Sequence, residues 1–302
     1  MRRALVIANP ASRGGEKRQA AAVRELARAG IEADAVATGY AGHAAMIADE
    51  RAGSYDAVFT LGGDGTAMDV VGALADKGPP VGILPGGTGN LLARSLGIPL
   101  TVPAAVRALV AGREARIDLG RLGDGRIFGI GAGVGVDATM IEETPLAWKR
   151  RLGVLSYVIV GVRSLLRFDS FQVRGAVDGV PFEQRASAIL VANFGTMFRH
   201  LLTLGDGILY DDGVLNVCIF SPATRADAAR ISYKMMRRDF SPDPCMSYLS
   251  GRKIEITTVP ARTVQADGEL AGSTPLSVRV LPGAGRLLLP QTASKKEAKN
   301  GG

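Results

Sequence analysis

The stretch SYDAVFTLGGDGTAMDV, Ser54 to Val70, decides the fold. An apolar run that ends at Leu61 is followed directly by glycines and an aspartate, and the residues after Gly65 have the apolar spacing of a helix. The stretch therefore predicts a strand, a loop and a helix in succession. In an open α/β sheet, the loops that leave the C-terminal ends of the strands form the ligand crevice. We expect residues 62–66 to be such a loop.

The same alternation repeats on both sides of this stretch. Strand-like runs at residues 3–8, 31–38 and 80–85 are each followed by a helical pattern, and helical patterns continue to about Gly112. Such alternation predicts a parallel sheet covered by helices on both faces. From about Arg116, short β-like runs separated by Gly, Asp-Gly and Pro turns predict an antiparallel β domain. Two helices are expected to interrupt it, Leu146 to Arg167 and Ala223 to Arg238.

The composition narrows the class of protein. The chain has 302 residues, and 47% of them are hydrophobic, so it can bury a core. Its length exceeds the usual size of one domain, and we therefore expect two domains. Cys218 and Cys245 fit no disulfide or zinc spacing, which favours a reducing cytosol. The N-terminal apolar run is too short for a signal peptide, and the longest apolar window, 152–166, is too short to span a membrane.

The net charge of +7 is compatible with several partners. Anionic lipid and anionic substrates fit a basic surface, and a basic protein with no special partner fits it equally well. Nucleic acid is the weaker choice, because aromatic residues make up only 5% of the chain and no nucleic-acid signature is present.

Two glycine loops carry the chemistry. LGGDGT ends at Thr66, and LPGGTGN ends at Asn90 after the next strand. Glycine permits positive φ and close approach of backbone N–H groups to phosphate, so two adjacent loops suggest one polyphosphate held between them. Asp64 would repel phosphate unless Mg²⁺ lies between them, or it fixes the loop through backbone hydrogen bonds. A simple turn with Asp64 as helix cap is the structural alternative. No GxxxxGK[ST] loop, dinucleotide GxGxxG spacing or protein-kinase motif is present.

Five motifs in order, NPASRGG, LGGDGT, LPGGTGNLLAR, LYDDGVLNV and QADGE, cover nearly the whole chain. This set resembles the soluble diacylglycerol kinase catalytic family, which includes sphingosine and ceramide kinases. GGDGT alone is also similar to NAD kinases and phosphofructokinases. The resemblance implies the fold class α/β plus β: a three-layer, NAD kinase-like nucleotide domain over residues 1–118 and an antiparallel β-sandwich for the lipid substrate over 119–287. A return of residues 288–302 to the first domain is left open.

The resemblance also implies ATP and Mg²⁺ as cofactors and a lipid hydroxyl as acceptor. The catalytic residues implied are Glu269, Asp267 and Asp64, where one late carboxylate takes the hydroxyl proton and the other steers it or a metal. A hairpin turn is the alternative explanation for Asp267-Gly268. The implied nucleotide-binding residues are Asn9, Ser12, Thr38, Gly62, Gly63, Asp64, Gly65, Thr66, Gly87, Thr88 and Asn90.

A structural Mg²⁺ is implied at Asp212, with the carbonyl oxygens of Leu209 and Val214. A β-turn explains these residues equally well.

Two positions depart from the family pattern. Met68-Asp69 replaces the usual Asn-Glu, so nucleotide or metal geometry can differ, and Leu91 stands where diacylglycerol kinases usually have an aspartate, which favours a sphingoid or ceramide acceptor.

The stretch from Ala147 to Phe168 places Trp148 and a basic cluster before an apolar helix. It predicts either a helix that docks on anionic lipid or a core helix with solvated ends. His43 and His200 are interpreted as surface or capping residues. The sequence thus predicts a cytoplasmic lipid kinase that contacts the inner face of the membrane peripherally and binds no nucleic acid. A homodimer, an NAD kinase and a catalytically inactive nucleotide or lipid sensor are left open.

Overall fold

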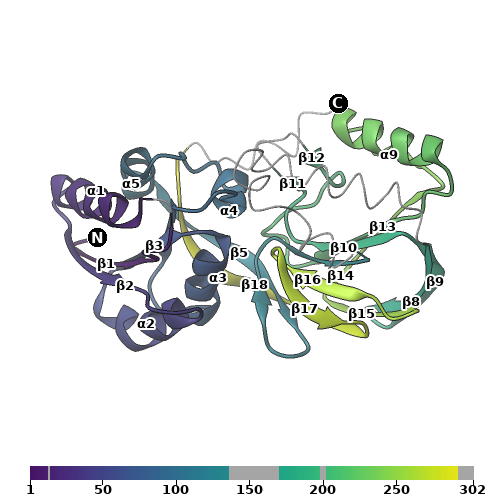
Figure 1. Cartoon of the computed structure of the whole chain (residues 1–302), viewed down its shortest axis with the longest axis horizontal. Coiled ribbons are helices and arrows are strands. Elements are labelled where there is room, and N and C mark those ends of the chain that lie inside the picture. The colour runs from purple at the N-terminus through teal and green to yellow at the C-terminus, as the bar shows by residue number, and fades with distance from the viewer. Residues whose placement is uncertain (13, 136–169, 198–201, 292–302) are drawn as a thin grey trace. The chain divides into compact units, whose positions relative to one another are not determined.

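A computed structural model of the chain describes residues 1–12, 14–135, 170–197 and 202–291 (Figure 1). The chain divides into two compact units, and each is described by itself. Unit 1 is Met1–Ile117 together with the stretch that begins at Gly283, and unit 2 is Asp118–Pro282. The predicted nucleotide and lipid roles of the two parts stay predictions.

Unit 1 alternates strands and helices as the sequence predicted. Its elements are β1 (Arg3–Ala8), α1 (Gly15–Arg28), β2 (Glu32–Ala37), α2 (His43–Arg51), η1 (Ala52–Ser54), β3 (Ala57–Gly62), α3 (Asp64–Ala73), β4 (Val81–Pro85), α4 (Leu91–Ser95) and α5 (Val102–Val110). The strands pair in the order β2-β1-β3-β4, all parallel. α1 and α5 lie on one face of this sheet and α2 and α3 on the other (Figure 1), which gives three layers. β1, β3 and β4 are almost entirely buried, as expected of strands covered on both faces.

The last part of β18 (Leu276–Leu289) completes this sheet. Leu287 pairs in parallel with Val81 of β4, and the N–H of Asp76 donates to the carbonyl of Ala284 at 2.9 Å. The Arg286 side chain donates to the carbonyl of Gly78 at 2.6 Å and pairs with Glu114. Unit 1 is therefore built from two segments that lie far apart in the sequence.

Unit 2 is antiparallel β with one described helix. Its elements, of which β5 and β18 begin or end in unit 1, are β5 (Arg113–Leu122), β6 (Ile127–Phe128), β7 (Gly131–Val134), β8 (Phe171–Val177), β9 (Val180–Ala186), β10 (Ala188–Ala192), β11 (Thr196–Met197), β12 (Leu202–Thr203), β13 (Leu215–Phe220), α9 (Arg225–Arg237), β14 (Met246–Gly251), β15 (Lys253–Val259), β16 (Thr263–Ala266), β17 (Glu269–Ser273) and β18. One sheet contains β18-β15-β8-β9 and the other has the order β14-β13-β10-β7-β16-β17.

The core of unit 2 lies between these two sheets. Val173, Ile254 and Val278 of one sheet and Val134 and Val191 of the other belong to one buried apolar cluster. Strand β13 shows how alternation builds this arrangement, because its residues point in turn to opposite faces. Val217 and Ile219 face the core, whereas Cys218 and Phe220 join a second cluster with residues of α9. The predicted fold class, a parallel three-layer domain plus an antiparallel β-sandwich, is confirmed.

The sequence located the helix at 223–238 to within two residues. Thr224 caps α9, because its hydroxyl accepts from the N–H of Asp227 and the Asp227 carboxylate accepts from the N–H of Thr224. The predicted helix at 146–167 lies outside the described residues. Among the described helices, none combines the length and apolar character needed to cross a membrane.

Candidate functional site

The predicted phosphate loops lie together at the C-terminal edge of the unit 1 sheet. The predicted loop at 62–66 is shorter in the structure, because Gly62 ends β3, Gly63 caps the helix and Asp64 begins α3. The 86–90 loop follows β4, the neighbour of β3. The loops meet backbone to backbone: the N–H groups of Gly86 and Gly87 both donate to the carbonyl of Gly62, at 2.8 and 2.9 Å. The two loops thus form one continuous surface of peptide groups.

Glycine is needed here for close approach. A Cβ on Gly86 would lie 2.9 Å from the nitrogen of Gly62, and one on Gly87 would lie 2.7 Å from the Cα of Gly63. The expectation that the loop glycines serve positive φ is wrong, because none of them has positive φ in the structure. Asn90 is the residue with φ of 47°, and its side chain accepts from the N–H of Gly87 at 2.9 Å and donates to the Gly87 carbonyl at 2.8 Å. Thr88 is exposed at the tip of this loop.

Asp64 is the first residue of α3 and also joins the two loops. Its Oδ1 accepts from the N–H of Leu92 at 2.9 Å, in the first turn of α4, and a Cβ on Gly89 would lie 3.4 Å from its Oδ2. Burial raises the pKa of Asp64, against the opposing effect of the N–H groups of Leu92 and Leu91. A cation beside this carboxylate would favour its charged form. The hydrogen bond to Leu92 supports the interpretation that Asp64 fixes the loop. The role of Asp64 as a metal ligand stays a prediction.

The remaining predicted nucleotide residues come from the two strands on the other side of β3. Asn9 follows β1, and its Nδ2 donates to Oγ1 of Thr66 at 3.3 Å. The hydroxyl of Ser12 donates to the Asn9 carbonyl at 2.6 Å. Thr38 follows β2 and is buried, with its N–H bonded to the carbonyl of Ala8 at 2.8 Å. All the predicted nucleotide residues therefore lie at the C-terminal ends of four adjacent strands.

The late acids lie at a hairpin of unit 2. Asp267 and Gly268 connect β16 and β17 with φ of 47° and 87°, the backbone of a two-residue hairpin turn. The structural alternative is therefore correct for the backbone. The Asp267 carboxylate, however, is not a passive turn residue: Oδ2 accepts from the N–H of Gly129 at 2.7 Å, and Oδ1 from the N–H groups of Ile130 and Gly131 at 2.8 and 3.0 Å.

Glu269 differs from Asp267 in its surroundings. It is exposed at the first position of β17, opposite Ala266 of β16. Arg126 lies near enough for the charge of Glu269 to contribute to the raised pKa of Arg126, although the larger cause is the hydrogen bond with Asp124. The Arg126 guanidinium also donates to the carbonyl of Leu270 at 2.8 Å. Of the two acids, one is held by three peptide groups and the other is presented to solvent.

A buried acid of β5 that sequence reasoning missed contacts the predicted metal turn. Asp118 is 2% exposed, and its Oδ2 accepts from the N–H of Gly213 at 2.6 Å. The predicted ligand Asp212 accepts from the N–H of Val214 at 3.1 Å, and partial burial, assisted by the charge of Asp118, raises its pKa. Leu209 is exposed in the same turn. Within the part of the chain that the structure describes, no group of three or more His, Cys, Asp or Glu could hold a metal ion. Asp212, Leu209 and Val214 stay a prediction.

Asn193 is a second residue that the sequence did not single out. It is fully buried, and its Nδ2 donates both to the carbonyl of Asp118 at 2.6 Å and to the carbonyl of Gly129 at 2.7 Å. It therefore ties the strand that carries Asp118 to the peptide groups that Asp267 holds. In unit 1, Arg18 of α1 was also missed, and its Nη1 donates to the Gly86 carbonyl at 3.0 Å. Neither residue belongs to a recognisable motif, so only contacts between distant segments reveal them.

Other sequence expectations can also be placed. Nδ1 of His43 accepts from the N–H of Gly39 at 2.9 Å, and its ring stacks on Tyr40. His200 and the segment around Trp148 lie outside the described residues. Met68 and Leu91, the two departures from the family pattern, are both buried.

Two family models match the chain. The diacylglycerol kinase catalytic domain matches residues 3–122, and the YegS C-terminal NAD kinase beta sandwich-like domain matches residues 131–289. A diacylglycerol kinase of Staphylococcus aureus is 30% identical over 281 residues, 91% of this chain and 88% of that protein. An uncharacterized protein of Synechocystis, sll0036, is 29% identical over 237 residues, which are 77% of this chain and only 54% of that protein.

Solved structures agree with this fold. A crystal structure of a candidate diacylglycerol kinase from Bacillus anthracis superposes with a TM-score of 0.83 at 22% identity, covering 97% of this chain and 96% of that one. An NAD kinase from Archaeoglobus fulgidus in complex with ATP superposes with a TM-score of 0.53 at 15% identity, covering 96% and 95% of the two chains. These two likenesses concern the fold alone. Together with the Staphylococcus relative and the family models, the motif order leads to one conclusion: the chain belongs to the diacylglycerol kinase family.

Proposed function

We propose that this protein is an ATP- and Mg²⁺-dependent lipid kinase that phosphorylates a lipid hydroxyl, with diacylglycerol as the first candidate acceptor. The observation that carries the proposal is the pair of glycine loops joined through the Gly62 carbonyl. The N–H groups of Gly86 and Gly87 are used in this contact, which brings the second loop beside the start of α3. The first N–H groups of α3 have no partner within the helix, and phosphate is bound by such amides together with the helix dipole.

The residues present fit the cofactors of this family. Asp64 is a half-buried carboxylate between glycines, and carboxylate oxygens are ligands that Mg²⁺ prefers. When bound, Mg·ATP supplies the phosphoryl group and part of the charge neutralisation that the transfer needs. Asn9, Thr66 and Asn90 would hold the loops in shape, because their side chains are already bonded to neighbouring backbone or to one another.

We assign different roles to the two late acids. Asp267 is a positioning residue, because both of its oxygens are engaged by the peptide groups of residues 129–131. Glu269 is the general base, because its carboxylate is exposed and immediately follows the turn that Asp267 fixes. In the transfer, the carboxylate of Glu269 takes the hydroxyl proton while the lipid oxygen bonds to phosphorus and the bond between phosphorus and the ADP oxygen breaks.

The acceptor is proposed from two observations. The Staphylococcus aureus relative at 30% identity is named diacylglycerol kinase, which supports diacylglycerol. The sequence argument for a sphingoid or ceramide acceptor rested on the aspartate that is missing where Leu91 stands. Leu91 is 7% exposed at the start of α4 and presents no polar group that would select a sphingoid acceptor.

The test incubates the purified full chain with labelled ATP, Mg²⁺ and, separately, diacylglycerol, ceramide, sphingosine, phosphatidylglycerol and NAD. We expect labelled phosphatidic acid. Glu269→Gln should lower turnover by roughly 10²- to 10⁴-fold with ATP affinity unchanged. Glu255→Gln, which neutralises an exposed acid on β15, is the matched control and should keep full activity. Label in NAD alone, or full turnover by Glu269→Gln, would refute the proposal.

A further inference from the structure

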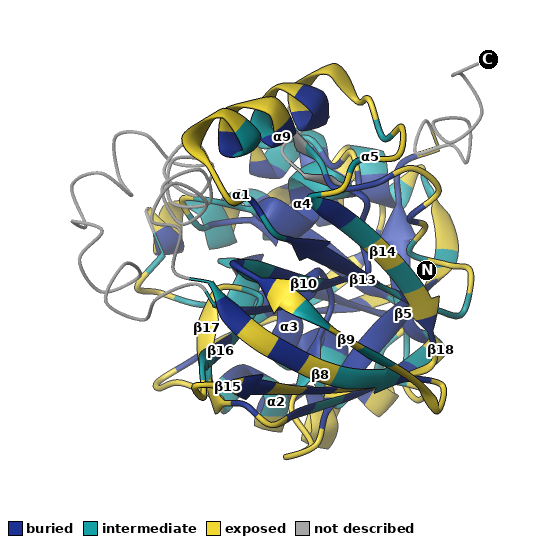
Figure 2. Cartoon of the chain, turned by 90° about the vertical axis from the view of Figure 1, so that its right-hand side faces the viewer, coloured by how far each residue is buried: buried dark blue, intermediate teal, exposed yellow. Residues whose placement is uncertain are grey.

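The helix α9 has two contrasting sides. Ala228, Ile231 and Met235 pack into the apolar cluster beneath it. On the opposite side, Tyr233 is 63% and Met236 69% exposed, which makes them two of the most exposed large apolar side chains described. Figure 2 shows this side of α9 as an exposed stripe. We call Arg225, Ala229, Tyr233, Met236 and Arg237 the outer face of α9.

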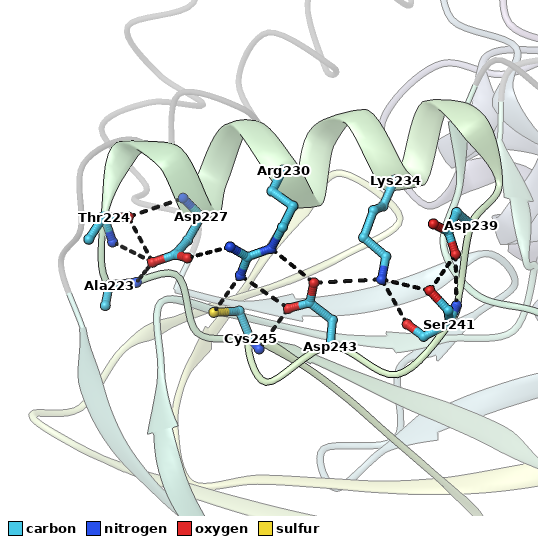
Figure 3. Close-up of polar contacts among 9 residues, drawn as sticks. All are labelled: Ala223, Thr224, Asp227, Arg230, Lys234, Asp239, Ser241, Asp243 and Cys245. Atoms are coloured by element: carbon cyan, nitrogen blue, oxygen red, sulfur yellow. Dashed lines mark hydrogen bonds and ion pairs between the residues drawn. The ribbon is translucent and has the colours of Figure 1, made fainter.

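The acidic groups near α9 are engaged by other residues. The Asp243 side chain is 4% exposed and pairs with Arg230 at 3.0 Å and Lys234 at 3.6 Å (Figure 3). Asp227 completes the helix cap and pairs with Arg230 at 2.8 Å. Asp239 accepts from the N–H and hydroxyl of Ser241. The acids therefore neutralise the cations on the flank and underside of the helix.

The arginines of the outer face have no such neutralisation. Within the described ranges, Arg225 and Arg237 form no ion pair, and the outer face contains no acid. These two arginines lie twelve residues apart, about 18 Å along a helix axis, with Tyr233 and Met236 between them. A cationic rim around exposed apolar side chains is the composition of a helix that lies in a membrane interface, where arginine reaches lipid phosphates and the apolar groups enter the acyl boundary.

We propose that the outer face of α9 docks on the surface of an anionic bilayer. Nucleic acid offers the same phosphates but no apolar phase for Met236, whereas a bilayer satisfies both halves of this surface. The choice of a membrane rests on the proposed lipid kinase function, since the acceptor of such an enzyme resides in one. The surface itself does not belong to the nucleotide loops or to the Asp267 hairpin, so binding and catalysis can be measured separately.

The test measures co-sedimentation of the full chain with vesicles of phosphatidylcholine containing 30% phosphatidylglycerol. Arg225→Gln with Arg237→Gln should weaken binding by roughly 20- to 30-fold, about fivefold for each charge. Tyr233→Ser with Met236→Ser should weaken it by about tenfold. All of these side chains lie on the exposed side of α9, so the urea midpoint should stay that of the wild type, and phosphorylation of a water-dispersed short-chain diacylglycerol should be unchanged.

Matched controls remove the same groups elsewhere. Arg24→Gln with Arg121→Gln deletes two exposed arginines, and Val180→Ser deletes an apolar side chain that is 69% exposed. Vesicle binding by the outer-face variants that equals that of these controls would overturn the proposal. So would a wild type that sediments with DNA but not with vesicles, or a dimer that the outer-face variants dissociate with vesicle binding intact. Because sedimentation needs no turnover, a protein that binds vesicles but phosphorylates no lipid would refute the proposed function and leave the docking surface supported.

Discussion

Replacement of Gly86 by alanine tests how the two glycine loops are joined. A Cβ at this position would lie 2.9 Å from the nitrogen of Gly62 and 3.0 Å from its Cα and carbonyl oxygen, whereas ordinary contacts are 3.4–4 Å. All three atoms belong to the backbone, so no side chain can move aside. The loops must separate by roughly half an ångström, which strains a packed region at a cost of about 1–3 kcal/mol.

The separation also weakens two hydrogen bonds. The N–H groups of Gly86 and Gly87 share the Gly62 carbonyl, and each bond contributes about 1 kcal/mol. With partial relaxation we expect Gly86→Ala to lower the free energy of unfolding by about 3 kcal/mol and the melting temperature by about 10 °C. Affinity for Mg·ATP should fall at least about tenfold, because the amides of the two loops no longer present one surface.

Urea unfolding followed by circular dichroism, with titration of a fluorescent ATP analogue, gives both quantities. Two alanine variants are controls. Gly53→Ala adds a Cβ with no atom within 4 Å, and Gly63→Ala adds one whose nearest neighbour is the Cα of Gly87 at 3.8 Å. Each should change stability by less than about 1 kcal/mol. If Gly86→Ala unfolds at the same urea concentration as Gly53→Ala, the close contact between the loops is not a constraint and the reasoning fails.

Three further outcomes are expected. Asp64→Asn should keep or slightly raise stability at pH 7, because burial already raises the pKa of this acid and disfavours its charge. Turnover with Mg·ATP should nevertheless fall at least about 100-fold. A urea midpoint below that of the wild type would contradict this prediction. Asp267→Asn should lower stability by about 2 kcal/mol, because its amide faces the N–H of Gly129, with ATP affinity unchanged in the same titration. Asp243→Asn should cost about 1–2 kcal/mol at pH 7, since the Arg230 guanidinium holds the pKa of Asp243 below its ordinary value. That stabilisation is complete above about pH 5 and is lost as the pH falls through the lowered pKa. The urea midpoints of the variant and wild type should therefore converge in acid below that pKa, and a constant difference would be the contrary result.

The strands and helices that carry strong apolar periodicity were predictable from the sequence. β3 and β4 are buried on both faces and read as continuous apolar runs. Strands with weak apolar signals were missed: β9 is mostly exposed along its length, and β14 is buried only at its two ends and has serine at two of its inner positions. Their place in the sheets depends on pairing with neighbours, which no local pattern encodes.

The residues of the candidate site likewise fall into predictable and unpredictable groups. The glycine loops and the Asp267 hairpin were predictable, because they are local motifs. The contacts of Asp118 and Asn193 were not, since they join segments separated by 64 or more residues. Of the two reasons given for the loop glycines, positive φ was wrong, and close approach to phosphate stays a prediction. The space that a glycine leaves beside another backbone depends on two segments in contact, whereas positive φ is a property of a single residue.

Strand β18 bears on how the protein is made on the ribosome. Its final residues complete the sheet of unit 1, where Leu287 pairs with Val81. During synthesis, the unit that emerges first must wait for residues 283–289, which follow the whole of unit 2, before its sheet is complete. The N-terminal glycine loops would thus gain their finished scaffold only after unit 2 has been translated, so a chain that stopped before Leu287 would carry its defect in unit 1.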